Sequence, residues 1–226
     1  RRARVIAAAA LVSVAVLGVV VAAGGADHAL GFVTGQTGRG LQVEAPVSAP
    51  YVWGALLGAD GSAVYYDQGL LTFQVTGPQV DLVIAAMTPL LALAAAGVLL
   101  LGVRQVRRGV PFVRLFPVLA LALVLVLIVA NKVGSPQFHT WLFAPTVLGL
   151  VIDRRRWVAP AAVVLTAAAL TQLVYPVLYG GILTPAVLPV AVLTLRNLVL
   201  VGLLVWMVAR LVRLPASVSA PVRVAP

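Results

Sequence analysis

Long apolar runs restrict this chain to structures that satisfy every backbone hydrogen bond away from water. Most of these runs hold about 20 residues, enough to cross the hydrocarbon core of a bilayer. They are Val5 to Ala23, Val80 to Val103, Pro111 to Ala130, Phe138 to Ile152, Val158 to Leu178 and Ala186 to Ala209. The runs lack the alternation of barrel strands, and lipid otherwise tolerates only helices. The sequence therefore predicts an all-α, polytopic bundle of about six transmembrane helices over residues 1–214.

Basic side chains gather at one side of this predicted topology, which argues for the cell membrane. Thirteen of the sixteen lysines and arginines flank the ends of segments that alternate to the same side. They are Arg1, Arg2, Arg4, Arg104, Arg107, Arg108, Arg114, Arg154, Arg155, Arg156, Arg210, Arg213 and Arg223. Such a bias marks the cytoplasmic side, so we expect both termini there. The formal charge of +10 then reflects topology, and no nucleic-acid partner is expected.

One long connection, residues 24–79, falls on the opposite, extracytoplasmic side. Its first half, residues 39–58, is interrupted by prolines and is interpreted as a helix lying in the interface. Residues 63–66 and 70–75 resemble two strands of a hairpin separated by Asp67-Gln68-Gly69. A loop of this length with structure of its own is usually functional. The Pro/Ala/Ser/Val-rich tail, residues 215–226, is expected to be disordered.

The segment from Asn131 to Trp141 concentrates polar chemistry between two apolar runs. Its polar side chains include Asn131, Lys132, Ser135, Gln137 and His139. Gly134 and Pro136 should break the helix and leave backbone groups for a ligand or water, while Lys132 and His139 suit an anion. The alternative is an interfacial turn with a snorkelling lysine and a tryptophan of the aromatic belt. We expect a binding site.

Two further cations stand apart from the topology-determining arginines. Arg39 precedes Gln42 and Glu44 on the outer side, where Arg39 suits a phosphate and Glu44 a sugar hydroxyl. A surface ion pair, which contributes little, is the alternative. Arg196, with Asn197 next to it, lies about 15 Å inside the last apolar run. A charge at that depth is costly unless it faces a partner or a wet cavity, so we expect Arg196 to face a ligand; snorkelling outward is the alternative.

The sequence gives little reason to expect a metal or a cofactor. Asp27 and His28 are at most half of a metal site, and two ligands without a third are a weak signal. The chain has no cysteine, so thiolate sites are excluded. We expect neither metal nor cofactor.

Three motifs together resemble a known family of membrane enzymes. They are Arg39-Gly40-Leu41-Gln42-Val43-Glu44, the pair Gly77-Pro78, and Asn131-Lys132-x-x-Ser135-Pro136-Gln137 ahead of Trp141. In these the chain is similar, from Val5 to about Leu214, to the C-terminal half of actinobacterial polyprenol-phosphate-mannose-dependent glycosyltransferases, the GT-C-type glycosyltransferase 87 family. The resemblance implies inverting transfer of a mannosyl-type sugar from a polyprenyl-phosphate donor to a lipid or glycan acceptor on the extracytoplasmic face, without a nucleotide donor.

The resemblance also implies roles for the candidate residues. The donor phosphate would be bound by Lys132, His139, Arg196 and Arg39, because fixed cations stabilise a phosphate leaving group. Substrate contacts would come from Gln137, Ser135, Asn131, Glu44 and Gln42. In such enzymes the general base is a carboxylate of the first extracytoplasmic loop, which we expect upstream of Arg1. The catalytic residue is therefore unassigned, and we expect this piece alone to be inactive.

Two other classes of membrane protein stay open. In a secondary transporter or lipid flippase, Arg196 and the break at residues 134–136 would gate a substrate path. Such proteins commonly carry inverted repeats with a break in each half, whereas the sequence shows one break. In a membrane scaffold subunit, the outer polar cluster would bind no ligand.

Overall fold

The computed structural model describes residues 2–25 and 38–216, and the chain divides into two compact units after Arg39. The first unit contains α1 (Arg2–Val20) and the short π-helical turn η1 (Val21–Gly25). The turn ends α1 at Gly24, whose φ of 82° is accessible to glycine without strain. From Ala3 to Val20 the side chains of α1 are exposed and almost all apolar, as in a lipid-facing helix. Asp27 and His28 lie outside the described residues.

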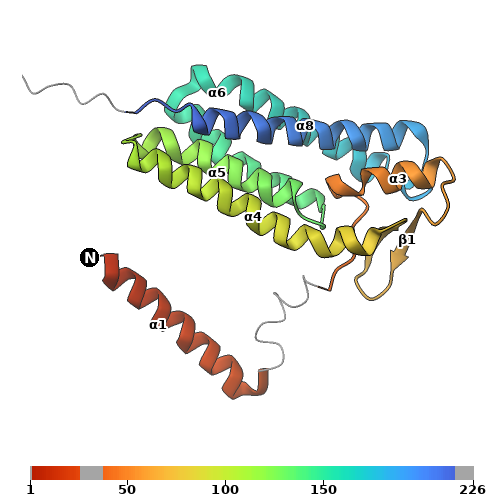
Figure 1. The fold of residues 1–226 in the computed structure, drawn as a ribbon, viewed down its shortest axis with the longest axis horizontal. Helices are drawn as coiled ribbons and strands as arrows, with labels where there is room; N and C mark the ends of the chain where they lie inside the picture. The colour runs from red at the N-terminus through yellow and green to blue at the C-terminus, as the bar shows by residue number, and fades with distance from the viewer. Residues whose placement is uncertain (1, 26–37, 217–226) are drawn as a thin grey trace, which may run out of the picture. The chain divides into compact units, whose positions relative to one another are not determined.

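The second unit is a bundle of long helices with a small hairpin at one end (Figure 1). Its elements are η2 (Pro46–Ser48), α3 (Ala49–Leu56), β1 (Ala63–Asp67), β2 (Thr72–Thr76), α4 (Val80–Arg107), α5 (Phe112–Val129), η3 (Pro136–Leu142), α6 (Phe143–Gln172), η4 (Leu173–Val177), α7 (Gly180–Leu183) and α8 (Val187–Val212). Helix α5 packs against α4, α6 and α8. Its Leu121 and Leu125 are fully buried in one core with Leu200 and Leu203 of α8.

Within the described residues, five helices are long and apolar enough to cross a membrane. They are Ala3–Gly25, Val80–Arg107, Phe112–Val129, Pro136–Val177 and Val187–Val212. The predicted all-α membrane bundle is therefore confirmed, and the protein has the character of a multi-pass membrane protein. The expected count of six differs, because the fourth and fifth predicted spans belong to one element, Pro136–Val177.

Helix α6 nevertheless folds back on itself near Asp153, whose φ of −150° and ψ of 75° interrupt the helix. Phe143 and Leu165 line the same cavity, although a straight helix would separate them by about 33 Å. The element is thus a hairpin with arms 143–152 and 154–172. A Cβ atom at Gly149 would overlap the Trp157 ring, so glycine allows the two arms to approach closely. The chain therefore reverses where the fourth predicted span ends.

The expected interfacial helix over residues 39–58 is shorter than predicted. Only α3, residues 49–56, is an α-helix; residues 46–48 form the 3-10 turn η2, and Gln42 pairs with Gln74 of β2 as a short third edge of the hairpin. Val43 N donates to Phe73 O at 3.1 Å, and Val75 N donates to Leu41 O at 2.9 Å. Proline lacks an amide hydrogen and is tolerated in a first helical turn, and accordingly Pro46 stands at the start of η2 and Pro50 in the first turn of α3. The prediction of one long helix here is wrong.

The predicted hairpin is present as the antiparallel pair β1 and β2. Asp67 shapes its turn, since its Oδ1 accepts the Gly69 and Leu70 amides at 2.9 and 3.0 Å. Beneath the hairpin a second core joins the loop to the end of the bundle, with members that include Leu41, Val43, Val52, Val75, Ile182 and Val190. Of the predicted tail, residues 217–226 lie outside the described part of the chain.

Candidate functional site

Arg196 is the most deeply buried charged side chain at this end of the bundle. It projects from α8 and is 1% exposed. Its Nη2 donates to the backbone carbonyl of Glu44 at 2.7 Å, and its Nη1 lies 3.3 Å from His139 Nε2. The guanidinium thus contacts the loop segment 41–45 and the polar segment 131–141, which are distant in sequence. The Arg196 side chain therefore points into the protein and does not snorkel outward.

The contact with Arg196 fixes the protonation of the His139 ring. A guanidinium has donors only, so His139 Nε2 must accept and the proton must sit on Nδ1. The protonated Nδ1 lies 3.0 Å from the Pro136 carbonyl oxygen and donates a hydrogen bond to it. Both ring nitrogens are therefore engaged, and the imidazole is neutral. In this arrangement His139 positions Arg196.

The two polar segments are also fastened to each other through Gln42. Its backbone amide donates to Lys132 O at 3.0 Å, and its Oε1 accepts the Gly134 amide at 3.0 Å. A Cβ atom at Gly134 would collide with the backbone of Glu44 and Ala45, so only glycine fits this approach. The motif around Gln42 and the motif around Lys132 thus form one buried structure.

Glu44 is a buried carboxyl held by the hydroxyl of Tyr179. Tyr179 Oη donates to Glu44 Oε1 at 2.6 Å, whereas Oε2 is buried and has no hydrogen-bond partner among the described residues. Burial raises the pKa of the Glu44 carboxyl above its ordinary 4.5, although the Tyr179 hydrogen bond opposes this shift. Burial and the adjacent Glu44 also raise the pKa of the Tyr179 hydroxyl. The carboxyl is therefore suited to holding or exchanging a proton.

Lys132 completes the set of buried cations predicted from sequence. It lies between α5 and η3 and is 5% exposed. Burial lowers the pKa of its ammonium group. Its backbone carbonyl accepts Gln42, so the residue is anchored within the polar cluster.

A cavity of about 610 Å³ borders this cluster at His139. It lies between the segment that begins at Pro136 and the end of the second arm of α6. Gln137, His139 and Thr140 line one wall; the residues on the other side are Leu165, Ala168, Ala169, Thr171, Gln172, Tyr175 and Pro176. A lining that combines apolar residues with a few polar groups is typical of ligand sites.

The structure brings together most, but not all, of the predicted site residues. Gln42, Glu44, Lys132, His139 and Arg196 meet in what we term the polar cluster. Gln137 lies with His139 on the cavity wall. Asn131 and Ser135 instead shape the intervening turn: Asn131 Oδ1 accepts Val133 N at 3.1 Å, and Ser135 O accepts Phe138 N at 3.0 Å. Arg39 ends the first unit, so its position relative to the polar cluster is undetermined.

Three side chains near the cluster were not predicted from sequence. Tyr179 donates a hydrogen bond to Glu44, and Thr140 and Gln172 line the cavity. Thr140 lies within the predicted polar segment, whereas Gln172 ends α6 and Tyr179 follows η4, and no local motif marks these two. Asn197, predicted beside Arg196, is 4% exposed, and its side-chain amide has no partner among the described residues.

Within the described residues, no group of three or more His, Cys, Asp or Glu side chains is arranged to hold a metal ion. No protein-family model, curated protein sequence or solved structure matches this chain. An assignment of function therefore depends on the polar cluster and the cavity beside it.

Proposed function

We propose that this chain is part of a membrane glycosyltransferase that moves a sugar, mannosyl-type by its resemblance, from a polyprenyl phosphate to a lipid or glycan acceptor. The observation that supports this most is the fixed, buried guanidinium of Arg196 held against His139, which in turn borders the 610 Å³ cavity. Two of the three motifs that resemble glycosyltransferases, those around Gln42 and around Lys132, meet at this point.

The electrostatics suit a lipid-phosphate leaving group. Negative charge grows on the phosphate as the bond to the sugar breaks, and preorganised cations stabilise such charge best where water is excluded. Arg196 is held by Glu44 O and His139, and its buried Nε has no partner among the described residues. Lys132 adds a second buried cation in the same cluster. A phosphate would satisfy the guanidinium donors of Arg196 bidentately.

The remaining groups suit the sugar and the lipid chain. Glu44 Oε2 lacks a partner within the described part of the chain, and a sugar hydroxyl would supply one. Gln137 and Thr140 offer polar contacts at the edge of the cavity, and Leu165, Ala168 and their neighbours offer an apolar wall for isoprene units. The general base is assigned to a carboxylate elsewhere in the protein, as the resemblance implies. His139 acts here by positioning Arg196.

Transfer from radiolabelled polyprenyl-phosphate mannose by the whole protein that carries this chain tests the proposal. Arg196→Gln and Lys132→Gln should each lower turnover by about 10²-fold or more, the cost of removing one preorganised charge contact. Arg196→Lys, which keeps the charge but loses the bidentate fork, should fall between. Arg104→Gln, on an exposed position of α4, is the matched charge control and should be unaffected. Unchanged turnover in both Gln variants would remove the phosphate-site assignment.

The same preparation separates the other two classes of protein. In sealed vesicles, a flippase or transporter would move the polyprenyl-phosphate sugar across the bilayer without forming a glycosylated product. A scaffold subunit would not bind the polyprenyl phosphate in native mass spectrometry. The enzyme should bind the lipid, form product, and lose both properties in Arg196→Gln.

A further inference from the structure

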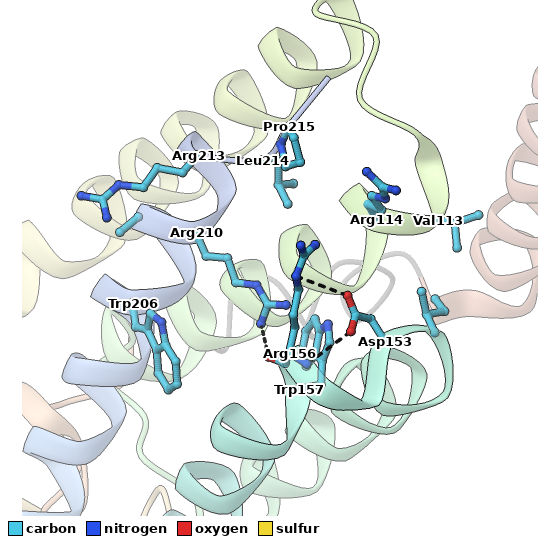
Figure 2. A pocket seen from close by; sticks show the side chains of 12 residues that line it. Val113, Arg114, Asp153, Arg156, Trp157, Trp206, Arg210, Arg213, Leu214 and Pro215 are labelled. Atoms are coloured by element: carbon cyan, nitrogen blue, oxygen red, sulfur yellow. Dashed lines mark hydrogen bonds and ion pairs between the residues drawn. The ribbon is translucent and has the colours of Figure 1, made fainter. Parts of the chain in front are cut away.

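A second cavity, of about 390 Å³, lies at the arginine-rich end of the bundle (Figure 2). It is formed where α5 begins, where α6 breaks at Asp153 and where α8 ends. Its polar lining and the ring that supports it are Arg114, Asp153, Arg156, Trp157, Arg210 and Arg213. Arg210 is about 21 Å along α8 from Arg196 at 1.5 Å per residue, so this cavity is separate from the polar cluster.

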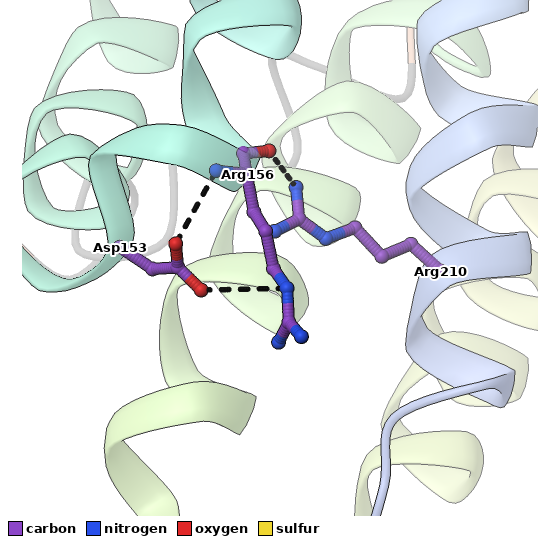
Figure 3. Close-up of polar contacts among 3 residues, drawn as sticks. All are labelled: Asp153, Arg156 and Arg210. Carbon is purple, nitrogen blue, oxygen red and sulfur yellow. Dashed lines mark hydrogen bonds and ion pairs between the residues drawn. The ribbon is translucent and has the colours of Figure 1, made fainter.

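Positive charge exceeds negative charge around this cavity. Four arginines face a single carboxylate, Asp153. That carboxylate is already engaged: Oδ1 accepts the Arg156 amide at 3.3 Å, and Oδ2 lies 3.6 Å from Arg156 Nε (Figure 3). An exposed pair of this kind contributes little to stability and leaves most guanidinium donors available to an anion.

Arg210 is held in place at the centre of this arrangement. Its guanidinium carbon lies 4.7 Å from the centre of the Trp157 ring, and its Nη1 donates to Arg156 O at 3.0 Å. Trp157 is 3% exposed and packs against Gly149, so the ring is a fixed platform. Figure 2 shows Arg156, Arg210 and Asp153 gathered around Trp157, with Arg213 extending away from them. The hydrogen bond uses one of five N–H donors on Arg210.

Membrane topology alone does not require this geometry. The orientation of a membrane protein depends on the number of positive charges near its helix ends. It requires neither a cavity nor a guanidinium held in one position. Arg104 and Arg107, at the end of α4, show the simpler case, because both are exposed and neither lines the cavity. Every cation at the cavity is an arginine, the side chain whose planar fork matches a phosphate bidentately.

We propose that this cavity binds the phosphodiester headgroup of an anionic phospholipid from the leaflet at the arginine-rich end. Basic pockets between transmembrane helices commonly hold such headgroups. Val113, Ile152, Trp206 and Leu214 give the cavity apolar walls beside its charges, as a site at the boundary between headgroups and acyl chains requires. The bound lipid bridges α5, α6 and α8 and holds the reversal at Asp153 against the end of α8.

Titration of the full chain in detergent with short-chain phosphatidylglycerol tests this proposal, with binding followed by native mass spectrometry. Phosphatidylcholine and inorganic phosphate are run alongside, to separate an anionic lipid from any lipid and from phosphate alone. Phosphatidylglycerol should bind, and the double variant Arg156→Gln/Arg210→Gln should weaken it by about tenfold or more. The matched double variant Arg104→Gln/Arg107→Gln has the same charge change on the same side and should retain the wild-type affinity.

Two further variants keep the test decisive if the first destabilises the fold. Arg210→Lys keeps a cation at the Trp157 ring but loses the fork, and should still weaken binding. Asp153→Asn keeps an acceptor for the Arg156 amide while removing the competing charge, and should tighten binding. Equal binding of phosphatidylcholine, equal loss in the Arg104/Arg107 variant, or full displacement by inorganic phosphate at the lipid's own concentration would each overturn the proposal.

Discussion

Replacing Gly134 by alanine tests the close approach on which the polar cluster is built. The added Cβ atom would meet the amide nitrogen of Ala45 and the carbonyl group of Glu44. These are backbone atoms and cannot rotate aside as a side chain does. Gly134 is not in the left-handed region of backbone conformation, so alanine is disfavoured there by lack of space alone.

The expected loss combines three contributions. Overpacking a tight contact costs about 1–3 kcal/mol. Displacing residue 134 also weakens the hydrogen bond from its amide to Gln42 Oε1, which contributes about 1 kcal/mol. Alanine restricts the unfolded chain and offsets about 0.4–1 kcal/mol of the loss. The net loss of unfolding free energy is therefore about 1–3 kcal/mol.

Thermal unfolding in detergent measures this loss against a matched substitution. Gly97 lies inside α4, and a Cβ atom there would meet nothing within 4 Å. Gly97→Ala should therefore stabilise the helix by about 0.5–1 kcal/mol. With about 2–4 °C per kcal/mol for a chain of this size, the midpoints of the two variants should differ by about 3 °C or more. If Gly134→Ala unfolds at or above the wild-type midpoint, the packing argument is wrong.

Three further predictions concern other buried polar contacts. The pKa of Glu44 is raised above 4.5 in the fold, so stability should fall as pH rises from 4.5 through the folded pKa; Glu44→Gln should remove this slope in unfolding midpoints measured from pH 4.5 to 8. Trp53 Nε1 donates to Thr194 Oγ1 at 2.9 Å, so a double-mutant cycle of Trp53→Phe and Thr194→Val should give a coupling of about 1 kcal/mol, and additive losses would contradict the bond. Gln105 Nε2 donates to Val212 O at 2.9 Å, so Gln105→Leu should cost about 1–3 kcal/mol and speed amide exchange at the end of α8, whereas unchanged exchange there would contradict that tie.

The helices were predictable because lipid leaves the backbone few alternatives. An apolar run near 20 residues must form its own hydrogen bonds, so length and composition suffice to place α4, α5 and α8. The hairpin was predictable for a local reason too, since Asp67 and the glycine two residues later form the turn that joins β1 to β2.

The loop before the hairpin was misjudged because its partner is distant. Residues 41–43 contain apolar positions that suit a helix or a strand, and their non-helical conformation is selected by backbone pairing with Phe73 and Val75. The reversal inside α6, by contrast, falls where hydropathy ended the fourth apolar run: that run ends at Ile152, and the helix breaks at Asp153. Short segments take the conformation that their neighbours in space stabilise.

The candidate site, too, was predictable in part from the sequence. Sequence alone indicated that Arg196 needs a partner, because a charge inside an apolar helix is costly, and it marked the segment from Asn131 to Trp141 as a break with exposed polar groups. The sequence did not reveal that Arg196 contacts His139 and Glu44, or that Tyr179 donates to Glu44. These contacts join positions 57 to 152 residues apart in the chain.

The membrane-helical class of this protein could be inferred from residue order alone, since the cost of unpaired backbone in lipid applies to each residue and needs no knowledge of its neighbours in space. Packing was needed to show that Arg196, His139, Glu44 and Gln42 share one buried cluster and that arginines from three helices surround a second cavity. Burial, hydrogen-bond partners and charge excess are properties of groups that packing brings together, and no single segment carries them.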